Sequence, residues 1–233
     1  MKLEALRKAV CEANRELERL GLITLTWGNV SGFDPERKLV VIKPSGVPYA
    51  TLTPAVMVVV DLAGKVVEGK LRPSSDTPTH VILYKAFPGV TGIVHTHSAH
   101  ATAFCQAGRE LPCFGTTHAD HFHGTVPLAR ALTAREVDED YEGHTGKVIV
   151  ERFRGLDPLA MPAVLVAHHA PFAWGPTPRK ALENAVALEA VAKMAIDTLQ
   201  LMPGAGAIPA HILDKHYQRK HGPNATYGQG GKK

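Results

Sequence analysis

Short β-rich runs follow one another between residues 22 and 67 of this chain, with turns instead of helices between them. Leu39–Ile42 and Met57–Asp61 are two of these runs, and Gly, Pro and Asp residues interrupt the segment that contains them. Helical patterns occur elsewhere, but the chain lacks the regular strand, helix, strand alternation that builds a parallel sheet. We therefore predict an α/β layered sandwich with a mixed or antiparallel sheet.

The helices are predicted from apolar spacing and from residues that begin or end a helix. Apolar residues recur every three or four positions from Leu3 to Leu20, and Gly21 is a suitable C-cap. Alanine and leucine dominate Pro178 to about Leu201, which we expect to be the longest helix. Shorter helices are expected at Thr77 to about Phe87, Ser98 to about Ala107 and Ala210–Lys220, and further strands at Ile93–His97, Val148–Phe153 and Ala163–Ala167.

Length and composition favour one domain, residues 1–233, with a mobile glycine-rich tail from about residue 222. The 45% hydrophobic content of 233 residues is enough for a substantial core. No apolar run is long enough to cross a bilayer, the first ten residues read as an amphipathic helix, and the three cysteines lack CxxC spacing. We expect a soluble cytoplasmic protein without a membrane partner.

The net charge of +4 is modest, and basic residues cluster only near the carboxyl end. No aromatic interleaving or nucleic-acid motif accompanies that cluster, so we expect no nucleic-acid partner. The cluster favours either a small anionic substrate or an ordinary solvated helix face.

The stretch GIVHTHSAHATAF, residues 92–104, carries three histidines. If Ile93–His97 is a strand, His95 and His97 leave the same face, about 6.6 Å apart along the strand. Two such rings can lean together onto one metal ion, with bonds of about 2.1 Å. His100 follows a predicted switch to helix at Ser98, so its direction is not set by this argument.

Further ligands for such a metal ion are available in two other motifs. VLVAHHAPFAWG contains His168 and His169, and either one completes a three-nitrogen set with the His-x-His pair. Asp76 is a reasonable carboxylate ligand, although a carboxylate at that place also suits the beginning of a helix. A single histidine is more often an ordinary surface or core residue, so the joint pattern carries the prediction.

Three short turns have the composition of an anion site. They are Thr26–Ser31, Lys43–Gly46 and Arg72–Ser75, each with hydroxyl or amide donors and a Gly or Pro that shapes the backbone. Backbone N–H groups in such turns can converge on phosphate oxygens. Taken singly, each is as easily an unremarkable turn.

The segment Thr116–Gly124 is a rival to the first metal site. It places His118, Asp120, His121 and His123 close together in sequence. The same residues also suit a general acid or base whose pKa is tuned by its neighbours.

Seven motifs together resemble the class II aldolase/epimerase family, in its L-ribulose-5-phosphate 4-epimerase branch. They are TLTWGNVSG, VIKPSGV, PSSDTPTH, GIVHTHSAHAT, GTTHAD, PFAWG and LDKHYQRKHG, spread from Thr24 to Gly222. The resemblance implies a three-layer α/β/α sandwich with a central, mainly antiparallel sheet. It also implies a homotetramer with active sites between subunits and a bound Zn²⁺, or Mn²⁺ or Co²⁺ in its place. The implied reaction is the interconversion of L-ribulose 5-phosphate and D-xylulose 5-phosphate in arabinose catabolism.

The resemblance assigns roles by position in the motifs. His168-His169-Ala170 stands where the family usually has His-Gly. The register of the motif therefore favours His169 as the third histidine ligand, but His168 stays an alternative. His121 and His123 replace expected aromatic residues, which puts the pKa of the neighbouring acid/base group in question. The implied metal ligands are Asp76, His95, His97 and His169; the phosphate-binding residues Asn29, Lys43, Ser45, Gly46, Ser74 and Ser75; the acid/base pair Asp120 and Tyr227; and further substrate-site residues His216 and Arg219.

The chemistry of a 4-epimerisation agrees with this set. The C4 hydrogen of a 2-ketopentose is not acidic, so cleavage and re-formation of the C3–C4 bond, assisted by a Lewis acid, is the easier route. The alternatives are a sugar-phosphate aldolase of the L-fuculose-1-phosphate type, a non-catalytic module like the adducin head, and a zinc hydrolase. Aspartate at position 76, where the aldolases carry glutamate, favours the epimerase.

Overall fold

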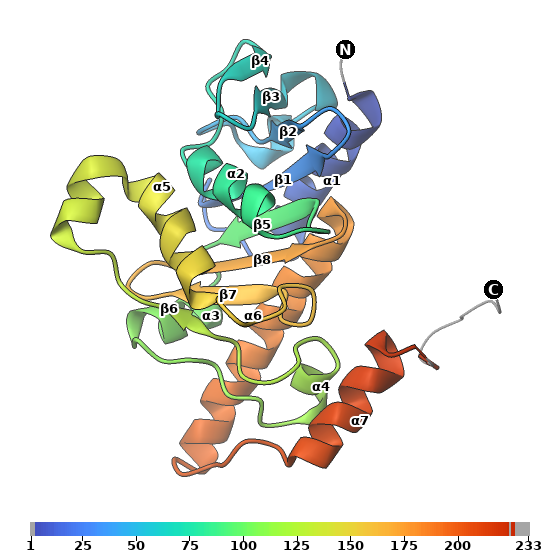
Figure 1. Ribbon diagram of the computed structural model, residues 1–233, viewed down its shortest axis with the longest axis vertical. Coiled ribbons are helices and arrows are strands. Elements are labelled where there is room, and N and C mark those ends of the chain that lie inside the picture. Colours follow the sequence, from blue (N-terminus) through green and yellow to red (C-terminus); the bar gives the residue numbers. More distant parts are fainter. Residues whose placement is uncertain (1–2, 224, 227–233) are drawn as a thin grey trace.

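A sheet of eight strands runs through the protein, and helices cover both of its faces (Figure 1). The computed structural model describes residues 3–223 and 225–226. The strands are β1 (Gly28–Asp34), β2 (Leu39–Ile42), β3 (Val58–Asp61), β4 (Val66–Glu68), β5 (Gly92–Thr96), β6 (Leu128–Ala129), β7 (Ala163–Val166) and β8 (Pro171–Gly175). Their order is β4-β3-β2-β1-β5-β8-β7-β6, and within the described residues only the β6–β7 pair is parallel.

The helices form one layer on each side of this sheet. They are α1 (Glu4–Arg19), α2 (Thr77–Ala86), α3 (Ala99–Gln106), α4 (Thr116–Ala119), α5 (Ala134–Arg152), α6 (Pro178–Leu201) and α7 (Ala210–His221), with 3-10 turns at Tyr49–Thr51 and Pro54–Val56. Helices α1, α3 and α6 pack together on one face, while α2 and α5 pack together on the other. Helix α7 lies beside α4, outside the layers (Figure 1). The predicted α/β/α sandwich with a mainly antiparallel sheet is confirmed.

Successive side chains of β1 point alternately toward the two helical layers on either face of the sheet. A Cβ added at Gly32 would lie 2.7 Å from Leu6 and 2.8 Å from Val10, so α1 packs directly on this face of the strand. Ser31 points the opposite way, and its Oγ lies 2.7 Å from Nδ1 of His80 in α2. Alternate residues of one strand therefore contact different helical layers, as the pleat requires.

The predicted strand Val148–Phe153 is wrong, because these residues belong to the last part of α5 and its C-cap. Val148 and Ile149 are buried, and α5 packs against α2 and the sheet, so tertiary packing outweighs the β propensity of this branched run. The sequence analysis also missed the beginning of α5. Thr133 caps it and Glu136 completes a capping box, a signal that the sequence does contain.

The other predicted helices and strands are present, with ends shifted by a few residues. One predicted turn differs, since Thr26–Ser31 becomes strand from Gly28 onward. Strand β8 was not predicted, although its PFAWG motif was noted. No helix within the described residues is long and apolar enough to cross a membrane. Of the predicted tail, positions 224 and 227–233 lie outside the described residues.

Candidate active site

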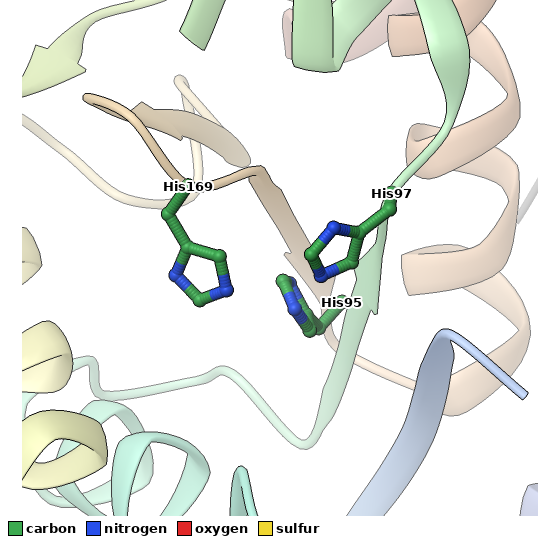
Figure 2. A group of neighbouring side chains, drawn as sticks. All are labelled: His95, His97 and His169. Carbon is green, nitrogen blue, oxygen red and sulfur yellow. The ribbon is translucent and has the colours of Figure 1, made fainter. Parts of the chain in front are cut away.

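Three histidine rings converge beside the end of β5 (Figure 2). His95 lies in β5, His97 follows the strand by one residue, and His169 lies in the turn between β7 and β8. One ring nitrogen of each lies within 4.8 Å of the others, and the ring centroids are 5.0 to 5.4 Å apart. We call these three residues the histidine cluster. Strand β5 brings His95 and His97 together, as the His-x-His spacing predicted.

The turn between β7 and β8 decides which of the two adjacent histidines joins the cluster. His168 adopts a left-handed conformation, φ 59°, and its side chain is exposed. His169 is partly buried and points at His95 and His97. The structure therefore places His169 in the cluster, in agreement with the register of the family motif.

The protonation state of the histidine cluster suits metal binding. Burial, reinforced by the neighbouring rings, lowers the pKa of His97 to about 4 and that of His169 to about 3. Nδ1 of His95 lies 3.0 Å from the Pro171 carbonyl oxygen. That carbonyl can only accept a hydrogen bond, so Nδ1 is the donor, and in the corresponding neutral tautomer Nε2 carries the lone pair. At neutral pH His97 and His169 are uncharged and can act as metal ligands.

Asp76 supplies a carboxylate to the same cavity. It is the N-cap residue of α2, but its side chain makes no capping bond. Its Oδ2 instead accepts a hydrogen bond of 2.6 Å from Asn29 Nδ2. Burial raises the pKa of Asp76, but the neighbouring His95 and His80 and the Asn29 bond outweigh it, so that pKa lies below its ordinary value. The carboxylate is therefore ionised.

The predicted phosphate-binding residues line this cavity of about 540 Å³ together with the histidine cluster. Two of the predicted turns, Lys43–Gly46 and Arg72–Ser75, are joined by backbone hydrogen bonds. Ser45 N donates to the Arg72 carbonyl at 3.0 Å, and Ser74 N donates to the Lys43 carbonyl at 2.9 Å. Asn29 Nδ2 donates to Ser74 Oγ at 3.1 Å, which joins β1 to them. The cavity residues with the predicted phosphate role are Asn29, Lys43, Ser45, Gly46, Ser74 and Ser75.

Lys43 is the cation of this cavity. Its Nζ lies 4.7 Å from the centre of the Tyr49 ring, and burial lowers its pKa to about 8. The ammonium therefore remains mostly protonated at neutral pH. A buried positive charge beside several hydroxyl groups is suited to an anionic ligand.

Two cavity residues were missed by the sequence analysis. Tyr141 and Glu142 of α5 line the cavity, and the Tyr141 ring lies 5.6 Å from that of His169. Both directly follow Asp140, whose backbone angles are not helical and which interrupts α5. No helix was predicted over these residues, so nothing in the sequence pattern directed them toward the histidine cluster.

Asp120 belongs to a second group of charged residues. Its carboxylate accepts hydrogen bonds from Arg219 Nη2 at 2.8 Å and from His216 Nδ1 at 3.1 Å, and Lys220 Nζ lies at 3.5 Å. Burial raises the pKa of Asp120, but the bonds from Arg219 and His216 and the charge of Lys220 bring it below its ordinary value. We call Asp120, His216 and Arg219 the aspartate group.

The rival metal site around Asp120 does not form among the described residues. His118 Nε2 lies 2.7 Å from the Gly124 carbonyl, and His123 Nε2 bonds Asp214 at 2.9 Å. Burial and the nearby Lys220 and Lys180 charges lower the pKa of His121 to about 4. Within the described residues, the histidine cluster is the one group whose nitrogens approach closely enough for a shared ion. Of the two metal sites that the sequence left open, the described residues therefore form only the histidine cluster.

The histidine cluster and the aspartate group lie apart within one chain. The cavity of the histidine cluster is not lined by Asp120, His216 or Arg219, and no hydrogen bond among the described residues joins the two. Figure 1 shows α4 and α7, which carry the aspartate group, well away from α2 and α5. Tyr227 lies outside the described residues.

Comparison with known proteins identifies a matching family model and curated relatives. Residues 8–196 match the family model for the Class II Aldolase and Adducin N-terminal domain. Proteins of Salmonella paratyphi A and Salmonella typhi named L-ribulose-5-phosphate 4-epimerase UlaF are 53% identical over 227 residues, which cover 97% of this chain and all of each relative.

Solved structures also resemble the chain. An L-fuculose 1-phosphate aldolase superposes with a TM-score of 0.79 at 24% identity, covering 94% of this chain and 97% of that one, a likeness of fold alone. The L-fuculose-1-phosphate aldolase of Thermus thermophilus has a TM-score of 0.65 at 26% identity, covering 88% of this chain and 98% of that one.

Proposed function

Because the chain belongs to the class II aldolase and adducin N-terminal domain family, we propose that it is a metal-dependent L-ribulose-5-phosphate 4-epimerase. It would interconvert L-ribulose 5-phosphate and D-xylulose 5-phosphate by breaking and re-forming the C3–C4 bond. The observation that carries this proposal is one cavity with a histidine cluster and Asp76 beside a group of hydroxyls and Lys43. Relatives that are 53% identical to this chain are named for the same activity.

The donor set of the cavity fits a divalent cation. His95, His97 and His169 offer three nitrogens within 4.8 Å of one another, and Asp76, which lines the same cavity but is outside that close group, offers an anionic oxygen; Zn²⁺ accepts this combination of ligands. In Figure 2 the Nε2 side of His169 faces His95 and His97, whereas Nδ1, which is buried without a hydrogen-bond partner among the described residues, points away from them. We propose Zn²⁺, with Mn²⁺ or Co²⁺ as substitutes. When bound, such a cation supplies Lewis acidity that stabilises negative charge developing on the sugar during bond cleavage.

The hydroxyl end of the cavity would hold the phosphate. Ser45, Ser74 and the Asn29 amide offer hydrogen-bond donors, and Lys43 supplies the positive charge. Cleavage releases an aldehyde that carries this phosphate. Anchoring the phosphate lets the aldehyde rotate and present its other face without leaving the protein.

Asp120 and Tyr227 are the proposed proton-transfer residues. The C4 hydroxyl must lose a proton when the bond breaks and regain one after rotation, so a group is needed on each side of the aldehyde. The Asp120 carboxylate is ionised and can therefore accept a proton, while His216 and Arg219 fix its position. We propose Tyr227 for the opposite side.

The separation of the aspartate group from the histidine cluster supports an oligomer. If both act on one sugar, the aspartate group of one chain must reach the histidine cluster of a neighbour. We propose a cyclic homotetramer with active sites between subunits and a cytoplasmic location.

Product analysis tests the reaction. The zinc-loaded protein should convert L-ribulose 5-phosphate into D-xylulose 5-phosphate. Accumulation of dihydroxyacetone and glycolaldehyde phosphate would instead indicate an aldolase. A protein without bound metal that stays inactive after zinc is added would indicate a non-catalytic module.

Removal of one ligand tests the metal site. His97→Ala should bind less than about one tenth of the wild-type zinc and lose nearly all turnover, because two nitrogens hold zinc poorly. Its circular dichroism spectrum should stay unchanged. The matched control is His168→Ala, which removes an exposed ring next to His169 and should keep both zinc and activity. Full zinc stoichiometry in His97→Ala would refute the assignment.

A further inference from the structure

Helix α3 begins two residues after His97, and its own N-cap residue does not cap it. Ser98 occupies the N-cap position, but its side chain bonds none of the free N–H groups of the first turn. Such groups need an acceptor, and here the acceptor comes from another helix. Glu189 of α6 accepts from His100 N through Oε1 and from Ala101 N through Oε2, both at 3.0 Å.

Glu189 also binds the side chain of the third histidine of the HTHSAH motif. Nδ1 of His100 lies 2.6 Å from Glu189 Oε1. The Glu189 side chain is only 18% exposed. Burial raises its pKa, but the bonds from Ala101, His100 and Ser98 outweigh this, so Glu189 is ionised. Donors from Ser98, His100 and Ala101 therefore converge on one partly buried carboxylate.

The turn held by Glu189 carries His97. On one side of the turn, β5 is fixed by the pairing of His95 with Phe172 of β8. On the other side, the first bond of α3 runs from Thr102 N to the Ser98 carbonyl at 3.0 Å. His97 lies between these two points, so the end of β5 and the start of α3 together set the backbone from which its ring reaches His95 and His169.

We propose that Glu189 is a positioning residue that aims His97 at the metal site by capping α3 from α6. His100 belongs to this support and not to the ligand set. The inference deepens the proposed function, because it assumes that the histidine cluster binds the metal ion.

Glu189→Gln tests the proposal, because it keeps the size of the side chain but removes the charge and one acceptor. Loss of an outer contact that orients a ligand typically weakens metal binding about 10- to 100-fold, and we expect that loss in zinc affinity, measured by competition with a chromophoric chelator. The visible absorption of the Co²⁺-substituted protein should change in intensity as well. The matched control is Glu183→Gln on the same helix, whose carboxylate is 45% exposed and pairs with Arg179. It should leave both readouts unchanged.

A second pair of variants covers the case in which Glu189→Gln does not fold. His100→Ala removes the imidazole donor and should weaken zinc binding. His100→Asn places an amide donor near the Nδ1 position and should restore it. Zinc affinity and cobalt spectra that match the wild type in folded Glu189→Gln or in His100→Ala would overturn the proposal.

These readouts need no sugar. A wild-type protein that binds zinc but does not epimerise would refute the proposed reaction and leave the role of Glu189 standing. A wild-type protein that binds no zinc would refute the metal site and this inference together.

Discussion

Single histidines in this protein differ in their contacts, although burial lowers the pKa of several of them. His97 and His169 face each other across the cavity, whereas His80 lies beneath β1 with its Nδ1 against the Ser31 hydroxyl. His118 lies far from the cavity, is 4% exposed, and has a pKa lowered to about 4. A shifted pKa by itself therefore does not identify a ligand, and the geometry of neighbouring nitrogens does.

The buried His118 leads us to predict how the stability of the folded protein changes with pH. Its pKa is about 4 in the folded protein against an ordinary value of 6.5, mainly because of burial. As the pH falls below 6.5, His118 becomes protonated in the unfolded chain but stays neutral in the folded protein. Protonation therefore favours the unfolded state, and the stability that is present above pH 6.5 is lost progressively toward pH 4. His118→Gln keeps a donor for the Gly124 carbonyl but does not titrate.

Urea unfolding at pH 7 and pH 5 measures this effect. The free energy of unfolding of the wild type should fall by about 2 kcal/mol more than that of His118→Gln over this interval. Equal losses in the two proteins would show that His118 does not contribute to the pH dependence.

At the scale of elements, α5 is two helical segments joined at Asp140. Asp140 has non-helical backbone angles, φ −167° and ψ 82°, and its Oδ1 accepts a hydrogen bond of 3.1 Å from Gly143 N. It therefore caps the second segment. The first two residues of that segment are Tyr141 and Glu142, which line the cavity of the histidine cluster. The helix break thus determines which side chains reach this cavity.

Gly143→Ala tests the importance of this break. A Cβ at Gly143 would overlap Oδ2 of Asp140, so the added methyl group displaces the cap. Alanine normally favours a helix, so stability should change little, while the shift of Tyr141 and Glu142 should lower kcat/KM by about 10- to 100-fold.

The readouts for this variant are thermal unfolding and the epimerase assay. Gly204→Ala is the matched control, because no atom of the described residues lies within 4 Å of its added Cβ. Wild-type turnover in Gly143→Ala would show that the cap does not influence the site.

At the scale of the whole molecule, the two groups of predicted catalytic residues lie on different parts of one chain. The histidine cluster lies at the end of β5 and in the turn between β7 and β8, whereas Asp120 is the C-cap residue of α4 and pairs with His216 and Arg219 of α7. This division explains why a monomer would not complete the proposed reaction. It also makes the proposed tetramer testable without a structure of the assembly.

Mixing two inactive variants tests whether neighbouring chains share a site. His97→Ala lacks the metal half and Asp120→Asn lacks the proton-transfer half, so each alone should be inactive. If chains exchange at random in a 1:1 mixture, about one quarter of sites combine two intact halves, and about a quarter of the wild-type rate should return.

The mixture is unfolded and refolded together before the assay, and each variant refolded alone is the control. No recovered activity in mixed oligomers would place both halves of the site within one chain.

The sequence by itself determined the features that depend on local spacing. Side chains alternate along a strand, so the His-x-His motif already implied that His95 and His97 share a face. The helices α1 and α6 could likewise be predicted, because their apolar periodicity and end residues are local signals.

Only the tertiary structure decided the features that depend on packing between distant segments. Residues 148–153 have the composition of a strand but form the last part of α5 and its C-cap, because α5 packs as a helix against α2 and the sheet. The left-handed turn at His168 presents His169 to the cavity, and Glu189 reaches the start of α3 across 89 residues of sequence. Local propensity differs by about 1 kcal/mol or less between conformations, whereas burying several apolar or charged groups contributes more, so packing prevails where the two disagree.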